Sequence, residues 1–304
     1  MKSETLSDVY SVVIQKFSDY FYHHFYKTYD KQVLAEAISR HKLCPVWLPP
    51  NLLTLGTLVL TLSYSCLLAY HDFHFLASTW SAHHDDIPNW LWLYVALCLL
   101  LELILDAVDG MHARRTGKTS AVGEMLDHWT DTWRLSVLHP LLIFSLYGRK
   151  EFGLSVANQF QFVSSIQFVF LLVFVTQKIT HVLFYPWCYD LANYYLIWFF
   201  AWTYYRDGSE WWKSNGLLPN WSNAYTTLIL NYVITCGLSV PMQLYYLVKS
   251  CSLRAVFPTL CSVSILFVSS LSLVMLTEIP EQQPRLFLLI HGVIFSDIVV
   301  TKKA

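Results

Sequence analysis

Four aspartates lie close together in the sequence, in a stretch flanked by long apolar segments. Asp106 and Asp109 are three residues apart, and Asp127 and Asp131 are four apart, so each pair shares one face of an α-helix. A carboxylate inside a bilayer costs roughly 2.5 to 3.5 kcal/mol on insertion scales, and something must compensate for four of them. Hard oxygen ligands favour Mg²⁺ or Mn²⁺, and four carboxylates suit two such ions acting together on phosphate groups.

Small residues and an arginine accompany the aspartates. Gly110 and Ala113 follow the second aspartate, and Gly123 comes one turn before the third. Positions without bulky side chains let a flat ring or a phosphate chain approach the helix backbone. Arg114 is always charged and has a forked head group that can hold a phosphate.

The elements that must position these residues are membrane-spanning helices. Of the 304 residues, 55% are hydrophobic and only 13% are charged, which lies outside the usage of soluble proteins. A spanning helix needs about 20 mostly apolar residues. Eight windows qualify: 48–70, 88–109, 129–147, 160–181, 189–204, 225–247, 255–276 and 285–301. The sequence therefore predicts an all-α, polytopic transmembrane bundle of about eight spanning helices.

A further helix is predicted before the first span. Its apolar residues recur at helical spacing, which favours a helix lying on the membrane surface: Tyr10, Val13, Ile14, Phe17, Tyr20 and Phe21. An amphipathic helix packed on protein fits equally well. The simplest division is an N-terminal cytosolic or interfacial segment, residues 1–46, followed by one transmembrane domain, residues 47–304.

Charge restricts the partners and the topology. The net charge of −1 leaves no basic excess for a phosphate backbone, which argues against nucleic acid and leaves membrane lipid as the main surrounding. Lys and Arg favour the cytosolic side of a membrane. Arg114, Arg115 and Lys118 follow the second window, so the link between the two aspartate pairs is predicted to face the cytosol.

The aspartates belong to a longer pattern, D-x2-D-G-x2-A-R-x8-G-x3-D-x3-D, which runs without a gap from Asp106 to Asp131. This pattern resembles the signature of the CDP-alcohol phosphotransferases. The stretches "ARRT", "LDH" and "WLPPN" resemble the choline and ethanolamine phosphotransferase branch of that family, as does "QQPRLFLLIHGVIFSDIVV" near the end. The resemblance extends from about Tyr29 onward.

The sequence also departs from that branch. Met111, His112 and Trp129 stand at variable positions of the signature, and they bear on the alcohol more than on the reaction. The branch continues for another pair of hydrophobic helices, so we expect this domain to be a C-terminally shortened form.

The resemblance implies an activity. The chain is expected to transfer phosphocholine or phosphoethanolamine from CDP-choline or CDP-ethanolamine to diacylglycerol, with release of CMP, in phospholipid biosynthesis. The endoplasmic reticulum or Golgi is the implied location. Two Mg²⁺ or Mn²⁺ ions would be held by the four aspartates, with Asp106 and Asp127 shared between them. The resemblance also implies the residues that bind the CDP-alcohol: Asn51, Asp106, Gly110, Ala113, Arg114 and Gly123.

A general base is needed to take the proton of the acceptor hydroxyl. His128 adjoins Asp127 and matches the position of the proton acceptor in the branch. Glu124 lies four residues earlier, where its carboxylate could orient the imidazole. Asp131 and Glu124 are the alternatives for the base.

Two other functions remain open. An ion or proton transporter would need intramembrane aspartates, but it gives no reason for the glycines and the arginine at their spacings. A catalytically silent relative would keep lipid or nucleotide binding. A purely structural role for the aspartates would need matching buried Lys or Arg, and the sequence offers no such set. The oligomeric state is also open, with a homodimer as one option.

Overall fold

Helices dominate the computed structural model of the chain. It describes residues 16, 44–76, 87–148, 154–180, 186–208, 210–216, 218, 220–250 and 253–301. Within these ranges the regular structure is helical, apart from one isolated bridge between Asn215 and Ser222. The predicted surface helix around residues 10–21 lies outside the described residues, except for Lys16.

The helices follow one another along the chain in this order: α3 Pro50–His71, α4 Asn89–Thr116, α5 Ala121–Trp133, the π-helical turn η2 Arg134–Leu138, α6 His139–Tyr147, α7 Val156–Thr180, α8 Pro186–Tyr205, α9 Glu210–Lys213, α10 Asn223–Ile234, the π-helical turn η3 Thr235–Ser239, α11 Val240–Ser250, α12 Leu253–Leu276, α13 Ile279–Gln282 and α14 Pro284–Thr301.

All eight predicted windows overlap helices of the described chain. Five stretches are long and apolar enough to cross a membrane: Pro50–His71, Asn89–Thr116, Val156–Gln177, Asn223–Ser250 and Val256–Leu276. The prediction of a polytopic helical bundle is confirmed. The number of eight spans stays a prediction.

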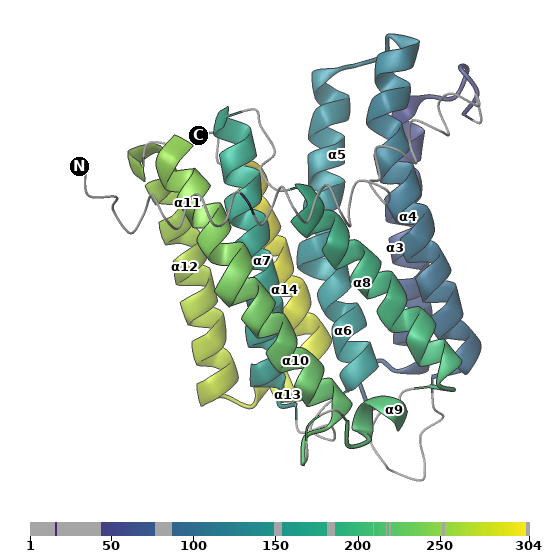
Figure 1. Cartoon of the computed structure of the whole chain (residues 1–304), viewed down its shortest axis with the longest axis vertical. Coiled ribbons are helices and arrows are strands. Elements are labelled where there is room, and N and C mark those ends of the chain that lie inside the picture. The colour runs from purple at the N-terminus through teal and green to yellow at the C-terminus, as the bar shows by residue number, and fades with distance from the viewer. Residues whose placement is uncertain are drawn as a thin grey trace.

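Connections alternate between the two ends of the bundle. In Figure 1 the turn that joins α4 to α5 lies at the upper end, and the short helices α9 and α13 lie at the lower end. The turn is tight because Gly117, with φ of 65°, ends α4 in the left-handed conformation, which glycine adopts without strain. The Ser120 hydroxyl then caps α5 by accepting a hydrogen bond from the Gly123 amide at 3.0 Å. As a result α4 and α5 run antiparallel.

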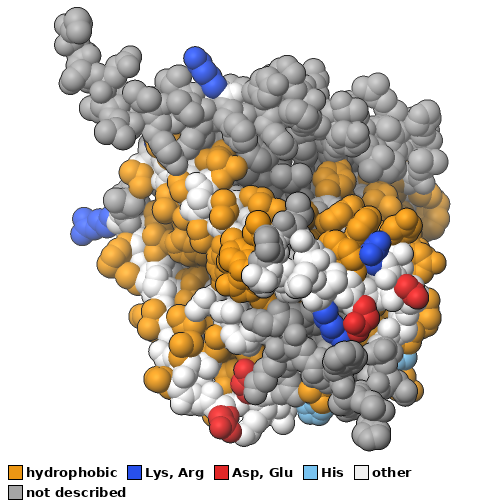
Figure 2. Space-filling view, turned by 60° about the horizontal axis from the view of Figure 1, so that its bottom comes forward, with side chains coloured by type: hydrophobic (Ala, Val, Ile, Leu, Met, Phe, Trp, Pro, Cys, Tyr) orange, Lys and Arg blue, Asp and Glu red, His pale blue; other side chains and the backbone are white. Residues whose placement is uncertain are grey.

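The described surface is rich in hydrophobic side chains. Figure 2 shows them over much of the flank of the molecule, with only scattered charged side chains between them. Exposed apolar residues are frequent on α3, α10 and α12, for example Val59, Leu230 and Ile265. A surface of this kind suits lipid contact, because exposed apolar area in water would be unfavourable.

The turn η2 is fixed by neighbours that lie far away in the sequence. Pro140 has no N–H and cannot donate to the carbonyl four residues earlier, that of Ser136. The Gln167 side chain on α7 donates to this carbonyl, with Nε2 3.1 Å from the oxygen. Gly292 on α14 lies so close that an added Cβ would be 2.3 Å from the Ser136 oxygen. Two helices therefore hold η2 directly beyond the last aspartate of α5.

Candidate active site

The structure brings the four aspartates to one cavity of about 360 Å³ near the α4–α5 turn. Carboxylate oxygens of Asp106, Asp127 and Asp131 lie within 4.8 Å of one another. Asp109 lines the same cavity, and its Oδ2 accepts a hydrogen bond from Thr54 Oγ1 on α3 at 2.6 Å. Helix α3 packs against both α4 and α5, the two helices that carry the carboxylates.

Sequence reasoning missed a buried arginine at this site. Arg134 is 5% exposed, and its Nη2 lies 3.1 Å from Asp106 Oδ1 and also donates to Asp131. Sequence analysis found no set of buried Lys or Arg that matches the four aspartates, and Arg134 is a single buried cation among several carboxylates. Arg134 follows Asp127 by seven residues and Asp131 by three, and these spacings place all three side chains on one helical face. The spacing indicates that Arg134 shares a face with Asp127 and Asp131, but it does not show which carboxylates of α4 the guanidinium reaches.

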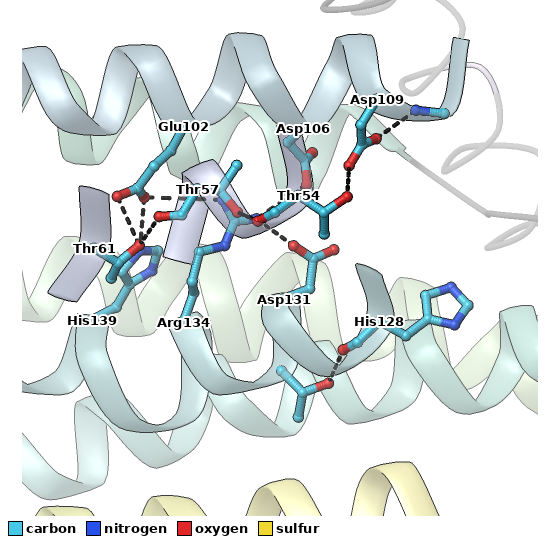
Figure 3. A network of polar contacts seen from close by, with 12 residues as sticks. Thr54, Thr57, Thr61, Glu102, Asp106, Asp109, His128, Asp131, Arg134 and His139 are labelled. Carbon is cyan, nitrogen blue, oxygen red and sulfur yellow. Dashed lines mark hydrogen bonds and ion pairs between the residues drawn. The ribbon is translucent and has the colours of Figure 1, made fainter. Parts of the chain in front are cut away.

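Sequence reasoning also missed a fifth carboxylate, that of Glu102. Glu102 precedes Asp106 by one helical turn and is 2% exposed. Its Oε1 accepts a hydrogen bond from Thr61 Oγ1 at 2.8 Å, and its Oε2 lies 3.9 Å from Arg134 Nη1. His139 Nε2 lies 4.0 Å from Glu102 Oε2. Figure 3 shows this polar network running from Glu102 through Arg134 to Asp131 and Asp106.

Helix α3 contributes hydroxyls that sequence reasoning also missed. Thr54, Thr57 and Thr61 are all buried and turn toward α4. They recur at spacings of three and four residues within an apolar span, which puts them on one helical face. Two of them bind carboxylates of α4, namely Asp109 and Glu102. Hydroxyls at this period are a sequence signal for a polar partner inside the bundle.

The remaining charge of the cavity fits divalent cations. The five carboxylates at and behind the cavity carry five formal negative charges, of which the guanidinium of Arg134 offsets one and that of Arg114 on the cavity wall another. Bound divalent cations would reduce the remaining surplus. No described side chain donates a hydrogen bond to Asp127, although this carboxylate lines the cavity. Clustered oxygen donors without nitrogen or sulfur suit Mg²⁺ or Mn²⁺. The donor set therefore fits the ions that the sequence predicts.

His128 also lines the cavity. Its ring packs edge-on against Phe174 on α7, with 5.2 Å between the ring centroids, and Figure 3 shows it directed away from Arg134 and Asp131. Glu124 is exposed, is not part of the cavity lining and forms no hydrogen bond with His128. The structure thus gives the histidine an aromatic support in place of the expected carboxylate.

The predicted substrate residues fall into two groups. Gly110 and Arg114 line the cavity beside the aspartates. Asn51 lies against Gly123, since an added Cβ on this glycine would be 3.0 Å from Asn51 Oδ1. Neither Asn51, Gly123 nor Ala113 belongs to the described cavity lining. The absence of a side chain at Gly123 therefore lets Asn51 approach α5 closely at the rim of the site.

A second, largely apolar cavity of about 480 Å³ adjoins the acidic one. It lies between α6, α7, α8, α10 and η3, and Phe170 and Val173 line both cavities. His139 and Asn193 are among its few polar residues. An apolar cavity and a carboxylate cavity thus share one wall on α7.

These features define a class: a helical membrane protein with a carboxylate site near one end of its bundle. The chain belongs to the CDP-alcohol phosphatidyltransferase family, whose model matches residues 47–236. The match includes every aspartate of the site, and it confirms the resemblance predicted from the signature.

Curated relatives share much of the sequence. The chain is 30% identical to ethanolaminephosphotransferase 1 of Homo sapiens over 268 residues, which cover 84% of this chain and 66% of the relative. It is 32% identical to the Mus musculus protein of the same name over 276 residues, with the same two shares. Cholinephosphotransferase 1 of Saccharomyces cerevisiae is 28% identical over 146 residues, 46% of this chain and 35% of the relative. The chain spans about two thirds of the length of the ethanolaminephosphotransferases.

Proposed function

We propose that this protein transfers phosphoethanolamine or phosphocholine from the corresponding CDP ester to diacylglycerol and releases CMP, as a step of phospholipid synthesis. The observation that carries the proposal is the cavity in which four aspartates converge with Arg114 and His128. Family membership supports the reaction type. The names of the relatives support the two alcohols.

Asp106, Asp109, Asp127 and Asp131 are the residues that would hold two Mg²⁺ or Mn²⁺ ions. When bound, such ions offset the charge of the diphosphate and the charge that develops on the CMP leaving group. Arg114 lies on the cavity wall, where its guanidinium can hold a phosphate oxygen of the CDP-alcohol. Because Gly110 has no side chain, the substrate can approach the backbone of α4 there. Asn51, Ala113 and Gly123 are proposed to contact the nucleotide at the rim.

The transfer itself exchanges one phosphorus–oxygen bond for another. The diacylglycerol hydroxyl oxygen attacks the phosphorus nearer the alcohol, and the bond from this phosphorus to the CMP oxygen breaks. His128 is the proposed acceptor of the hydroxyl proton, a role that contributes roughly 10² to 10⁴ in rate. Asp131 is engaged by Arg134, and Glu124 lies outside the cavity lining, so both alternative bases are less suitable.

The apolar cavity is the proposed binding site of the diacylglycerol chains. It shares Phe170 and Val173 with the acidic cavity, so a lipid held there could present its hydroxyl to the aspartates. The protein is an integral membrane protein, and we propose residence in the endoplasmic reticulum or Golgi with the site facing the cytosol. Protease protection of a tag inserted after Gly117 in microsomes tests this orientation.

CMP release by the purified full chain tests the reaction. Protein in detergent is supplied with diacylglycerol, Mg²⁺ and either CDP-ethanolamine or CDP-choline in parallel. Release of CMP that stops on chelation and resumes with Mg²⁺ is the expected result. Nucleotide binding without release would indicate a catalytically silent relative, and ion flux in vesicles without release would indicate a transporter. Either result contradicts the proposal.

A further inference from the structure

The charged residues of α4 and α5 form a ladder along two facing helices. Glu102, Asp106 and Asp109 recur at spacings of four and three on α4, and Asp127, Asp131 and Arg134 recur at the same spacings on α5 and η2. Because the helices are antiparallel, Arg134 arrives at the level of Glu102 and Asp106. We call these six residues the charged ladder. Its inner end contains the one guanidinium of the set.

Arg134 connects both sides of the ladder. Its Nη2 is shared between Asp106 Oδ1 on α4, at 3.1 Å, and Asp131 on its own helix. Its Nη1 points to Glu102, 3.9 Å from Oε2. A planar guanidinium can reach several carboxylates in fixed directions, whereas an ammonium is a single point charge. Arg134 is thus the part of the ladder that sets the distance between Asp106 and Asp131.

These two aspartates are also two of the three carboxylates that could hold a metal ion together. The Arg134 side chain is 6% exposed, against 10% for Asp106 and 22% for Asp131. Each aspartate therefore presents its inner side to the guanidinium and retains exposure toward the cavity. A residue that holds ligands from behind in this way orients them before the ion arrives.

Fold stability alone is a weak reason for this arrangement. Burial of a charged cluster costs desolvation free energy, and well-packed apolar residues often stabilise a protein as much or more. The surroundings nevertheless fix Arg134 in place. Gln167 and Gly292 hold η2 through Ser136, and Glu102 is itself held by Thr61. The fixed position of the guanidinium is better explained by its contacts with Asp106 and Asp131, which are two of the proposed metal ligands.

We propose that Arg134 is a positioning residue, which holds Asp106 and Asp131 in the geometry that binds divalent cations and confines those cations to the cavity side of the ladder. This inference rests on the proposed function, because it assigns a role toward the ions of that site. Arg134 itself touches neither substrate nor the reacting atoms in this account.

The test compares Mn²⁺ affinity, measured by electron paramagnetic resonance of free Mn²⁺ with the purified full chain in detergent. Arg134→Lys keeps the charge but loses the fork that spans both helices, so affinity is expected to fall roughly 10- to 100-fold. Turnover at limiting Mn²⁺ should fall as well, and it should recover toward the wild-type rate at saturating Mn²⁺. Arg285→Lys is the matched control: this buried arginine donates to the Asp72 and Phe73 carbonyls and is not part of the cavity lining, so Mn²⁺ affinity should stay close to wild type.

Unchanged or tighter Mn²⁺ binding by folded Arg134→Lys would overturn the proposal, even if its melting temperature is lower. Should that variant not fold, Arg134→Gln replaces it, and weaker Mn²⁺ binding is again expected because one amide cannot bridge both carboxylates. Failure of both variants to fold would also overturn the proposal, since Arg134 would then be a folding residue. If the wild-type protein binds Mn²⁺ but releases no CMP, the proposed function fails, whereas the role of Arg134 is still decided by the Mn²⁺ affinities of the variants.

Discussion

The charged ladder carries carboxylates at both ends. At the inner end they are buried next to a guanidinium, and at the outer end, near the α4–α5 turn, they face a cavity. At the inner end, Glu102 and Arg134 are buried and linked to each other through Nη1 and Oε2 at 3.9 Å. At the outer end, Asp109 and Asp127 face a cavity of about 360 Å³. Both ends belong to the same pair of helices, so hydropathy alone does not separate them. The difference lies in whether the protein itself supplies the compensating charge.

This comparison separates two reasons for placing a carboxylate inside a membrane protein. An internal guanidinium and hydroxyls compensate the inner carboxylate, and such a pair needs nothing from outside. The outer carboxylates exceed the internal cations, and the divalent cations proposed for this site would reduce their mutual repulsion. A surplus of buried charge beside a cavity is therefore the stronger indication of function.

Removal of one outer carboxylate should have the largest effect. Asp127→Asn keeps the size of the side chain but removes a charge that no described donor compensates, and turnover is expected to fall by roughly 10²- to 10³-fold or more. CMP release is the measurement. Glu210→Gln, an exposed change that affects only the pair with Lys213, serves as control and should leave CMP release unchanged. A near wild-type rate for Asp127→Asn would show that the reaction does not require this carboxylate of the outer end.

The base assignment predicts the next largest effect. His128→Ala should lower kcat by roughly 10²- to 10⁴-fold, with much less change in CDP-alcohol affinity, because the imidazole acts on the acceptor hydroxyl. Steady-state kinetics with separate nucleotide-binding measurements would show this. His74→Ala, an exposed change in the turn that follows α3, should behave as wild type. Wild-type turnover in His128→Ala would exclude this histidine.

A smaller effect is expected from the support of Asp109. Thr54→Val removes the hydroxyl that donates to Asp109 Oδ2 at 2.6 Å, and the loss of such a supporting bond should weaken Mn²⁺ binding about tenfold. Thr227→Val is matched, since its hydroxyl bonds only to the Asn223 carbonyl of its own helix. Equal Mn²⁺ affinity in the two variants would argue against a role for α3 at the outer end.

The smallest effect on the chemistry concerns the packing behind the inner end. Gly292→Ala would bring a Cβ to 2.3 Å from the Ser136 oxygen, so α14 or η2 must shift, with a cost of about 1 to 3 kcal/mol in stability. A lower melting temperature is expected. Gly237→Ala is the control, because an added Cβ there meets nothing within 4 Å. Equal melting temperatures would show that α14 does not constrain η2.

Much of the outer end could be predicted from the sequence. The spacings of Asp106, Asp109, Asp127 and Asp131 define two helical faces, and Gly117 with Ser120 allows the short turn that brings them together. Local rules of helix periodicity and capping are sufficient for that inference.

The inner end was harder to predict. Glu102 and Arg134 lie within apolar windows, where a lone charge is easily taken for an exception to a spanning helix. Their pairing depends on the relative level of two helices, which periodicity does not specify. The support of η2 by Gln167 and Gly292 depends on contacts between segments far apart in the chain. Such contacts carry no local signal.

The number of Mn²⁺ ions bound per chain shows whether the outer carboxylates hold external cations. Equilibrium dialysis of the purified chain with a saturating CDP-alcohol should give two Mn²⁺ ions for the wild type and fewer for Asp127→Asn. Stoichiometric loss in that variant would agree with four carboxylates that require external cations. If the wild-type chain binds no Mn²⁺, or if the Asp127→Asn chain binds as many ions as the wild type, the outer carboxylates do not form the proposed cation site.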